Sequence, residues 1–132
     1  MITLKDYEKF EDYRLLILDT DKVFARELRS HLHMFNIESD IKSIPASKNF
    51  VKVTSDYNLI ITDLDELLHR NDYKMITHYL NCFKNIIFTT SHNDIGESTI
   101  HYQFNQLIKK NNYTLLIEKI LLYLKKIQIN YN

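Results

Sequence analysis

Residues 59–63 read Leu-Ile-Ile-Thr-Asp, a short apolar run that ends on an acidic residue. Similar runs stand at residues 15–19, which read Leu-Leu-Ile-Leu-Asp, and at residues 86–90, which read Ile-Ile-Phe-Thr-Thr. Continuous apolar runs of this length are typical of strands that are buried on both faces, as in a parallel sheet covered by helices. The three runs therefore predict the central strands of such a sheet.

Segments with the periodicity of amphipathic helices lie between and after these runs. Apolar residues recur at every fourth position at Phe24, Leu28 and Leu32, and the same spacing returns within residues 116–124. Strands that alternate with helices imply right-handed crossovers, so the predicted fold is α/β: a flavodoxin-like, doubly wound, five-stranded parallel sheet with helices on both faces. In chain order, the predicted strands lie near residues 14–19, 38–44, 58–63, 85–90 and 105–108, and the predicted helices at 22–34, 47–54, 66–82, 95–103 and 112–127.

The composition narrows the class of protein. The chain has 132 residues, of which 45% are hydrophobic, and this is enough for one domain with one ordinary core. Lysine plus arginine and aspartate plus glutamate number 17 each, so the basic excess of a nucleic-acid-binding domain is missing. The single Cys82 cannot form an intramolecular disulfide, and no apolar stretch approaches the roughly 20 residues that span a bilayer. We therefore expect a cytoplasmic protein without direct nucleic-acid or membrane contact.

Polar side chains stand where the predicted strands end. Asp19 ends the first strand, Asp63 the third and Thr90 the fourth, and Lys109 follows the fifth. In an open α/β sheet, ligands bind beyond the carboxyl ends of the strands. Carboxylates are ligands for Mg²⁺, a hydroxyl can donate to a phosphoryl oxygen, and lysine supplies a compact positive charge. This set suggests phosphoryl transfer to a carboxylate, which requires mainly positioning and charge neutralisation.

Four segments resemble, in order and spacing, the signature segments of the receiver domains of bacterial two-component response regulators. They are residues 16–21, 59–64, 86–91 and 107–109. The resemblance covers residues 13–127, which would form the receiver-like domain. Residues 1–12 would then be an N-terminal extension, and residues 128–132 a C-terminal tail or the start of a linker.

The resemblance implies a phosphorylation site and a metal site. Asp63 would accept a phosphoryl group from a histidine kinase or a phosphotransfer protein. Asp19, Asp63 and the backbone carbonyl of Asp65 would bind Mg²⁺, with Asp21 as a further candidate ligand. No organic cofactor is implied, and the only enzymatic activity expected is self-phosphorylation and autodephosphorylation at Asp63.

The resemblance also implies a switch. Lys109 would contact the phosphate, and Thr90 would move to hydrogen-bond the phosphorylated Asp63. The movement would change the face built by the fourth helix, fifth strand and fifth helix, which would bind a downstream target protein or a second copy of the chain. Such a domain would take part in a phosphorelay of signal transduction.

The chain departs from the family pattern at several positions. Thr20 stands in place of a second acid, and a hydroxyl is a poorer ligand for Mg²⁺ than a carboxylate. Gln106 stands in place of the aromatic switch residue, so the usual coupling to a rotating ring cannot operate there. Lys110 replaces the proline that follows the family lysine through a cis bond, and a cis bond without proline costs roughly 2.5–4 kcal/mol. We therefore expect a trans bond and a lysine that sits differently. Glu66 adds negative charge near the pocket.

Structural interpretations remain beside the functional ones. Aspartates at strand ends also cap helices, and this interpretation is favoured for Asp21, whereas a functional one is favoured for Asp63. Thr90 can equally belong to a polar turn, and Lys109 can belong to a solvated lysine pair. Two alternative functions stay open. One is a phosphorylation-independent pseudo-receiver that binds proteins. The other, less favoured, is a phosphatase of the haloacid-dehalogenase type, whose first motif resembles residues 60–65.

Overall fold

The computed structural model describes residues 13–70, 85–91 and 107–131. Several predictions from the sequence therefore fall on residues outside the described ranges. They are the N-terminal extension at 1–12, the later part of the helix at 66–82, the helix at 95–103 and the role of Gln106.

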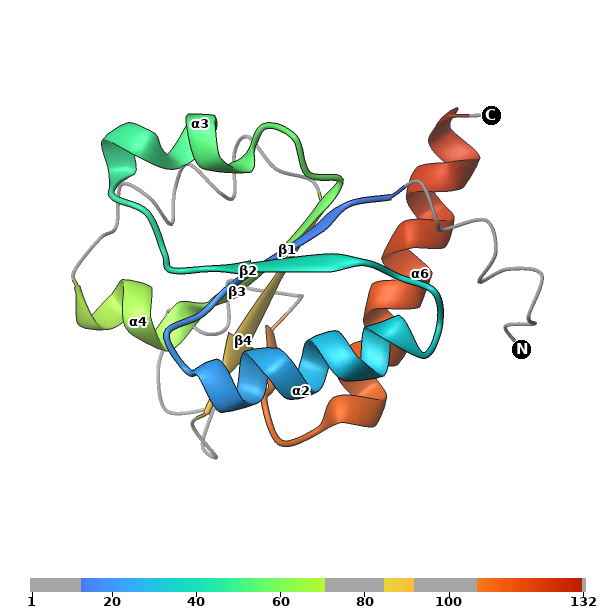
Figure 1. The fold of residues 1–132 in the computed structure, drawn as a ribbon, viewed down its shortest axis with the longest axis horizontal. Coiled ribbons are helices and arrows are strands. Elements are labelled where there is room, and N and C mark those ends of the chain that lie inside the picture. The colour runs from blue at the N-terminus through green and yellow to red at the C-terminus, as the bar shows by residue number, and fades with distance from the viewer. Residues whose placement is uncertain (1–12, 71–84, 92–106, 132) are drawn as a thin grey trace.

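The described residues form five strands and the helices between them (Figure 1). The strands are β1 (Leu15–Leu18), β2 (Ser39–Lys42), β3 (Leu59–Asp63), β4 (Ile86–Thr90) and β5 (Leu107–Lys109). The helices are α2 (Lys22–His33), α3 (Phe50–Thr54), α4 (Leu64–His69) and α6 (Tyr113–Tyr131), with a short 3₁₀ turn, η1 (Ser47–Asn49), before α3.

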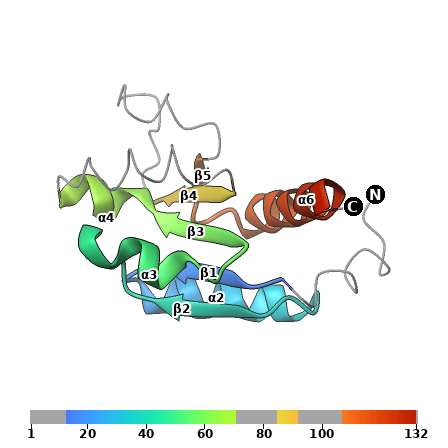
Figure 2. The same ribbon diagram turned by 90° about the horizontal axis from the view of Figure 1, so that it is seen from above.

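The strands pair in parallel in the order β2-β1-β3-β4-β5. This is the flavodoxin-like order, so the predicted fold class is confirmed. Figure 2 shows the sheet from above, with β3 between β1 and β4 and with α6 beside it. The carboxyl ends of all five strands consequently lie along one edge of the sheet.

Each face of the sheet is covered by its own helices and has its own core. Because successive residues of a strand point to opposite faces, Leu15 and Ile17 of β1 pack on one face and Leu16 and Leu18 on the other. The α2/α6 core also includes Phe24, Leu28, Leu32, Ile61, Ile87, Ile108, Leu116, Ile120 and Leu124. The α3/α4 core also includes Ile44, Phe50, Ile60, Leu64, Leu67, Ile86 and Phe88.

The N-terminus of α2 is capped as the sequence indicates. The Asp21 carboxylate accepts a hydrogen bond from the Phe24 N–H at 3.1 Å, which satisfies one of the free donors of the first turn. The structural interpretation of Asp21 is therefore confirmed.

Several elements differ from their predicted bounds, and α4 and α6 differ most. Helix α4 begins at Leu64 rather than residue 66, because Asp63 caps it by accepting the Asp65 N–H at 3.1 Å. It ends at His69, with Arg70 as its C-terminal cap, so the single helix predicted to 82 is wrong. Helix α6 continues to Tyr131 rather than ending at 127, and β5 (Leu107–Lys109) ends at Lys109 rather than at residue 108.

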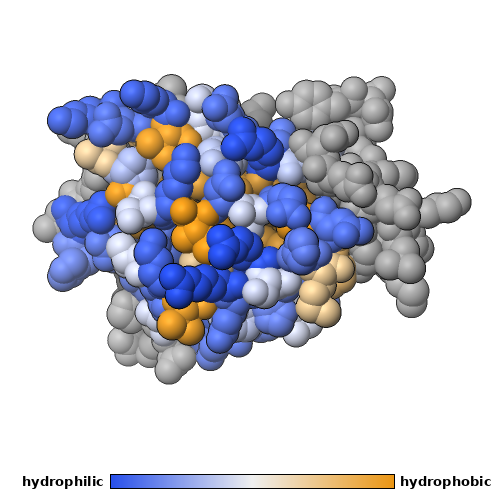
Figure 3. Space-filling view, viewed as in Figure 1, coloured by the Kyte–Doolittle hydropathy of each residue, from blue (hydrophilic) through white to orange (hydrophobic). Residues whose placement is uncertain are grey.

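The surface is mainly hydrophilic on the face shown in Figure 3, where hydrophobic residues form small separate areas. In the described ranges, no helix has the length and apolar character needed to cross a membrane.

Truncation of a buried residue of α2 tests its packing. Leu28 is fully buried in the α2/α6 core, whereas Val23, on the same helix, is 68% exposed. We expect Leu28→Ala to lower the free energy of unfolding by about 2–5 kcal/mol and Val23→Ala to change it by less than about 0.5 kcal/mol. Urea denaturation followed by circular dichroism measures both; equal losses would contradict the packing of α2.

Candidate functional site

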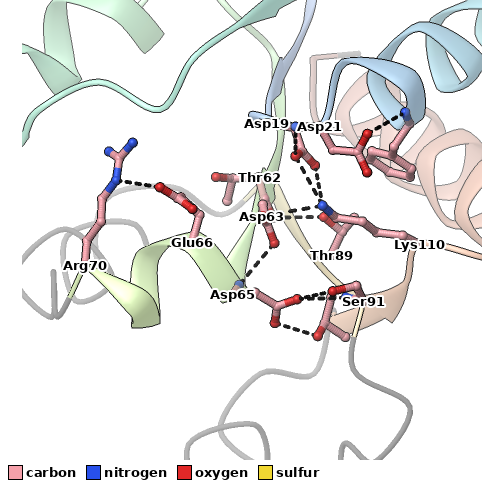
Figure 4. A network of polar contacts seen from close by, with 12 residues as sticks. Asp19, Asp21, Thr62, Asp63, Asp65, Glu66, Arg70, Thr89, Ser91 and Lys110 are labelled. Atoms are coloured by element: carbon pink, nitrogen blue, oxygen red, sulfur yellow. Dashed lines mark hydrogen bonds and ion pairs between the residues drawn. The ribbon is translucent and has the colours of Figure 1, made fainter.

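A cluster of charged side chains lies at the carboxyl edge of the sheet (Figure 4). Asp19 directly follows β1, Asp63 is the last residue of β3, and Lys110 directly follows β5. The three residues therefore stand at the ends of three different strands. In the sheet, β3 is the neighbour of β1, and β4 lies between β3 and β5. Their position agrees with the general placement of ligand sites in open α/β sheets.

Lys110 bridges the two carboxylates. Its Nζ lies 2.9 Å from Oδ2 of Asp19, 3.1 Å from Oδ1 of Asp19 and 3.4 Å from Oδ2 of Asp63. The side chains are 12% exposed for Lys110, 1% for Asp19 and 9% for Asp63. Oδ2 of Asp19 has no hydrogen bond of good geometry within the described part of the chain, so its contact with Lys110 is one of charge. The three residues form a buried ion-paired cluster.

The lysine that reaches the acidic residues is Lys110, not the predicted Lys109. Lys109 is the last residue of β5, and strand alternation places it on the opposite face from Ile108, which belongs to the α2/α6 core. Lys110 follows Ile108 by two residues and continues on that face. The strand was predicted to end at residue 108, whereas it ends at Lys109, so the first residue after it is Lys110. The described residues contain no cis peptide bond, so the expected trans bond between Lys109 and Lys110 is confirmed.

The same alternation explains which hydroxyl lies beside Asp63. In the register of β3 and β4, Thr89 is the partner of Asp63, and it follows Ile87 of the α2/α6 core by two residues. Its hydroxyl is buried and donates to the Thr62 carbonyl oxygen at 3.4 Å. Thr90, the predicted hydroxyl, alternates to the other face. The sequence pattern therefore contained a signal for Thr89, because strand residues two apart share a face.

Thr90 and Ser91 bind Asp65. The Thr90 hydroxyl donates to Oδ1 of Asp65 at 2.6 Å, and Ser91 donates to Oδ2 through its N–H at 2.8 Å and its hydroxyl at 2.9 Å. These three hydrogen bonds join the start of α4 to the end of β4 (Figure 4). The family resemblance implies only a backbone role for Asp65 and none for Ser91, and the local sequence pattern carries no signal for their contact because it joins segments that are distant in the chain.

Burial raises the pKa of Asp63 to about 6, and the negative charges of Asp19 and Asp65 add to this rise, while Lys110 opposes it. The pKa of Lys110 is raised as well. Burial alone would lower it, but the hydrogen bond to Asp19 and the charges of Asp63 and Asp19 outweigh that effect. Lys110 is therefore protonated at neutral pH. Perturbed pKa values of this kind gather at functional sites more often than elsewhere.

Other predicted residues lie at the border of the cluster. The Asp21 carboxylate caps α2, and the backbone N–H of Asp21 donates to Oδ1 of Asp19 at 2.9 Å. Thr20 is exposed. Glu66 points away from the cluster and pairs with Arg70 at 2.9 Å, so its charge is compensated on α4 (Figure 4).

The resemblance to receivers implies Mg²⁺, and the residues do not fit this ion in the arrangement that the structure shows. Mg²⁺ requires near-octahedral oxygen ligands and usually keeps several waters. The space between Asp19 and Asp63 contains the Lys110 ammonium group, and the Asp65 carboxylate is bound to Thr90 and Ser91. Among the residues of the described ranges, no group of three His, Cys, Asp or Glu side chains could hold a metal ion.

Comparisons with known proteins support the fold. No protein-family model matches the chain. No curated protein is similar enough to match. Six chains of solved structures match, and one is described as the trimeric coiled coil of yeast Spc42, amino acids 181–211, fused to another protein of solved structure. It is 16% identical in sequence, with a TM-score of 0.66, and the match covers 90% of this chain and 82% of that chain. Such a likeness shows the fold alone.

Replacement of each of the two neighbouring lysines by methionine, in separate variants, distinguishes their contributions to stability. Lys110→Met leaves two buried carboxylates without their cation, and loss of one partner from a buried ion pair costs about 3–5 kcal/mol. Lys109→Met removes the same charge from the opposite face and is expected to cost less than about 1 kcal/mol. Chemical denaturation of both variants at pH 7 measures the difference. A larger loss for Lys109→Met would contradict the placement of Lys110.

Asp63→Asn is expected to stabilise the domain at neutral pH. The folded pKa of about 6 lies above the unfolded value of 3.8, so the folded state binds the extra proton, and the stability of the wild-type chain falls as the pH rises between these values. Asparagine keeps the helix cap without the buried charge. The variant should exceed the wild-type chain by roughly 2 kcal/mol at pH 7. Denaturation curves at pH 7 and pH 4 measure this; a difference that does not shrink at pH 4 would contradict it.

Proposed function

We propose that the chain is a receiver-type signalling domain in which Asp63 accepts a phosphoryl group from a histidine kinase or phosphotransfer protein in the cytoplasm. The observation that carries this proposal is the convergence of Asp63, Asp19 and Lys110 at the carboxyl edge of a flavodoxin-like sheet. A raised pKa of about 6 still leaves most of Asp63 ionised at neutral pH, so the carboxylate can act as a nucleophile.

The transfer needs few groups. An ionised oxygen of Asp63 forms a bond to phosphorus while the bond between phosphorus and the donor nitrogen breaks, and that nitrogen keeps the electron pair and takes a proton from solvent. The ammonium of Lys110, 3.4 Å from Asp63, neutralises charge on the phosphoryl oxygens. Thr89, the register partner of Asp63 on β4, has a hydroxyl that could donate to those oxygens.

A phosphoryl group on Asp63 would change the contacts at the end of β4. It brings about two negative charges and three acceptor oxygens, and Lys110 would turn from Asp19 toward them. The repulsion of Asp65 by the phosphate would weaken its bonds to Thr90 and Ser91. The change at the end of β4 would then reach a protein-binding face that includes β5, which pairs with β4, and α6, whose Leu115 and Leu122 are exposed.

A second candidate function is a phosphorylation-independent protein-binding module. It is favoured by the fact that the polar groups of the edge already satisfy one another. Asp65 accepts hydrogen bonds from Thr90 and Ser91, and Lys110 pairs with Asp19 and Asp63, so all three carboxylates have partners without a phosphate.

Phosphorylation by a small phosphodonor tests the first function. The purified chain is incubated with phosphoramidate, and the phosphoprotein is measured by intact mass and by its lability to hydroxylamine, which cleaves acyl phosphates. We expect one phosphoryl group on the wild-type chain, none on Asp63→Asn, and one on Asp65→Asn, which serves as the matched acidic control. A wild-type chain that stays unmodified at saturating donor would favour the second function.

A further inference from the structure

We propose that Lys110 is the built-in counter-cation of this site and takes the place of a divalent metal ion, so that the site functions without Mg²⁺. The part of this inference that concerns function rests on the proposed acceptance of a phosphoryl group by Asp63. The part that concerns the site itself rests on the geometry alone.

The ammonium group stands where a bridging cation would have to stand. It lies within 2.9 Å of Asp19 and 3.4 Å of Asp63, two carboxylates that come from different strands. Direct ligands of Mg²⁺ would bind at roughly 2.1 Å, so the ion would need the same space between the same oxygens. Lysine and metal are therefore alternatives at this position, and both cannot be accommodated.

Lys110 is held in place from two sides. Its N–H donates to the Thr90 carbonyl oxygen at 2.8 Å, which fixes the backbone directly after β5. Its Nζ lies 5.0 Å from the centroid of the Phe24 ring, which stacks on Tyr113 at 5.8 Å. A cation over an aromatic ring is favoured, and more so when it is shielded from water. A metal ion would have to displace a lysine that is already bound on several sides.

A site in which a divalent ion had displaced the Lys110 ammonium group would also be electrostatically unfavourable. A divalent ion between Asp19 and Asp63 would leave the Lys110 ammonium close to it with a like charge and with little access to water, because its side chain is only 12% exposed. In the loop after β1, Thr20 stands where a second acid would compensate the charge, and the Asp21 carboxylate already caps α2 through the Phe24 N–H. Two carboxylates are too few to hold both cations.

Metal titration of neighbouring lysine variants tests the inference. Binding of Mn²⁺ is measured by electron paramagnetic resonance, and the shift in Tm by Mg²⁺ is measured at constant ionic strength, for the wild-type chain, Lys109→Met and Lys110→Met. We expect no binding and no Tm shift up to 10 mM for the wild-type chain and for Lys109→Met, and an affinity at least tenfold higher for Lys110→Met. Millimolar or tighter binding by the wild-type chain that is lost in Asp63→Asn would overturn the inference, and this measurement does not depend on whether Lys110→Met folds.

Phosphorylation with and without metal separates this inference from the proposed function. The wild-type chain is treated with phosphoramidate in EDTA and in 10 mM Mg²⁺. Equal modification of Asp63 in both supports the inference and the function. Modification only with Mg²⁺ supports the function and overturns the inference. No modification in either, together with the expected metal titrations, rejects the function and leaves Lys110 as the counter-cation of a site that is not phosphorylated.

Discussion

The burial of β1 and β3 on both faces is the constraint on which the rest of the structure depends. β1 is apolar at all its positions and β3 at its first three, and both strands are buried throughout, so helices must cover both sides of the sheet. Parallel pairing then brings the end of each strand to the same edge. The first polar residues after the apolar runs, Asp19 and Thr62-Asp63, are thereby brought to the same edge of the sheet.

Strand alternation divides the polar edge into two groups. Asp19, Asp63 and Lys110 each follow a residue of the α2/α6 core by two positions, and they form the charged cluster. Thr90 follows Phe88 of the α3/α4 core by two positions and binds Asp65 instead. The pocket that the receiver resemblance describes as one site is thus built here as an ion-paired cluster and a separate hydroxyl–carboxylate contact.

The features that could be predicted from the sequence are those that depend on local pattern. The apolar runs of β1, β3 and β4 and the spacing of Phe24, Leu28 and Leu32 gave the fold class, and Asp21 was correctly interpreted as a cap. The position of β5 could not be predicted to the residue, because a strand of three residues has too little pattern to fix its ends. The prediction therefore named Lys109 as the lysine that follows the strand, whereas the lysine beside the two carboxylates is Lys110. The contact of Asp65 with Ser91 depends on tertiary structure, which a local sequence pattern does not indicate.

Asp63 has two structural roles besides its place in the charged cluster. It ends the central strand, and it caps α4, whose Leu64 and Leu67 pack in the core on the other side of the sheet from Lys110. One carboxylate thus joins the two layers of helices: its one oxygen faces the lysine, and the other holds the first turn of α4. A covalent or electrostatic change at Asp63 would therefore alter its contact with Lys110 on one face and the cap of α4 on the other at the same time. The sheet would couple the two layers of helices mechanically.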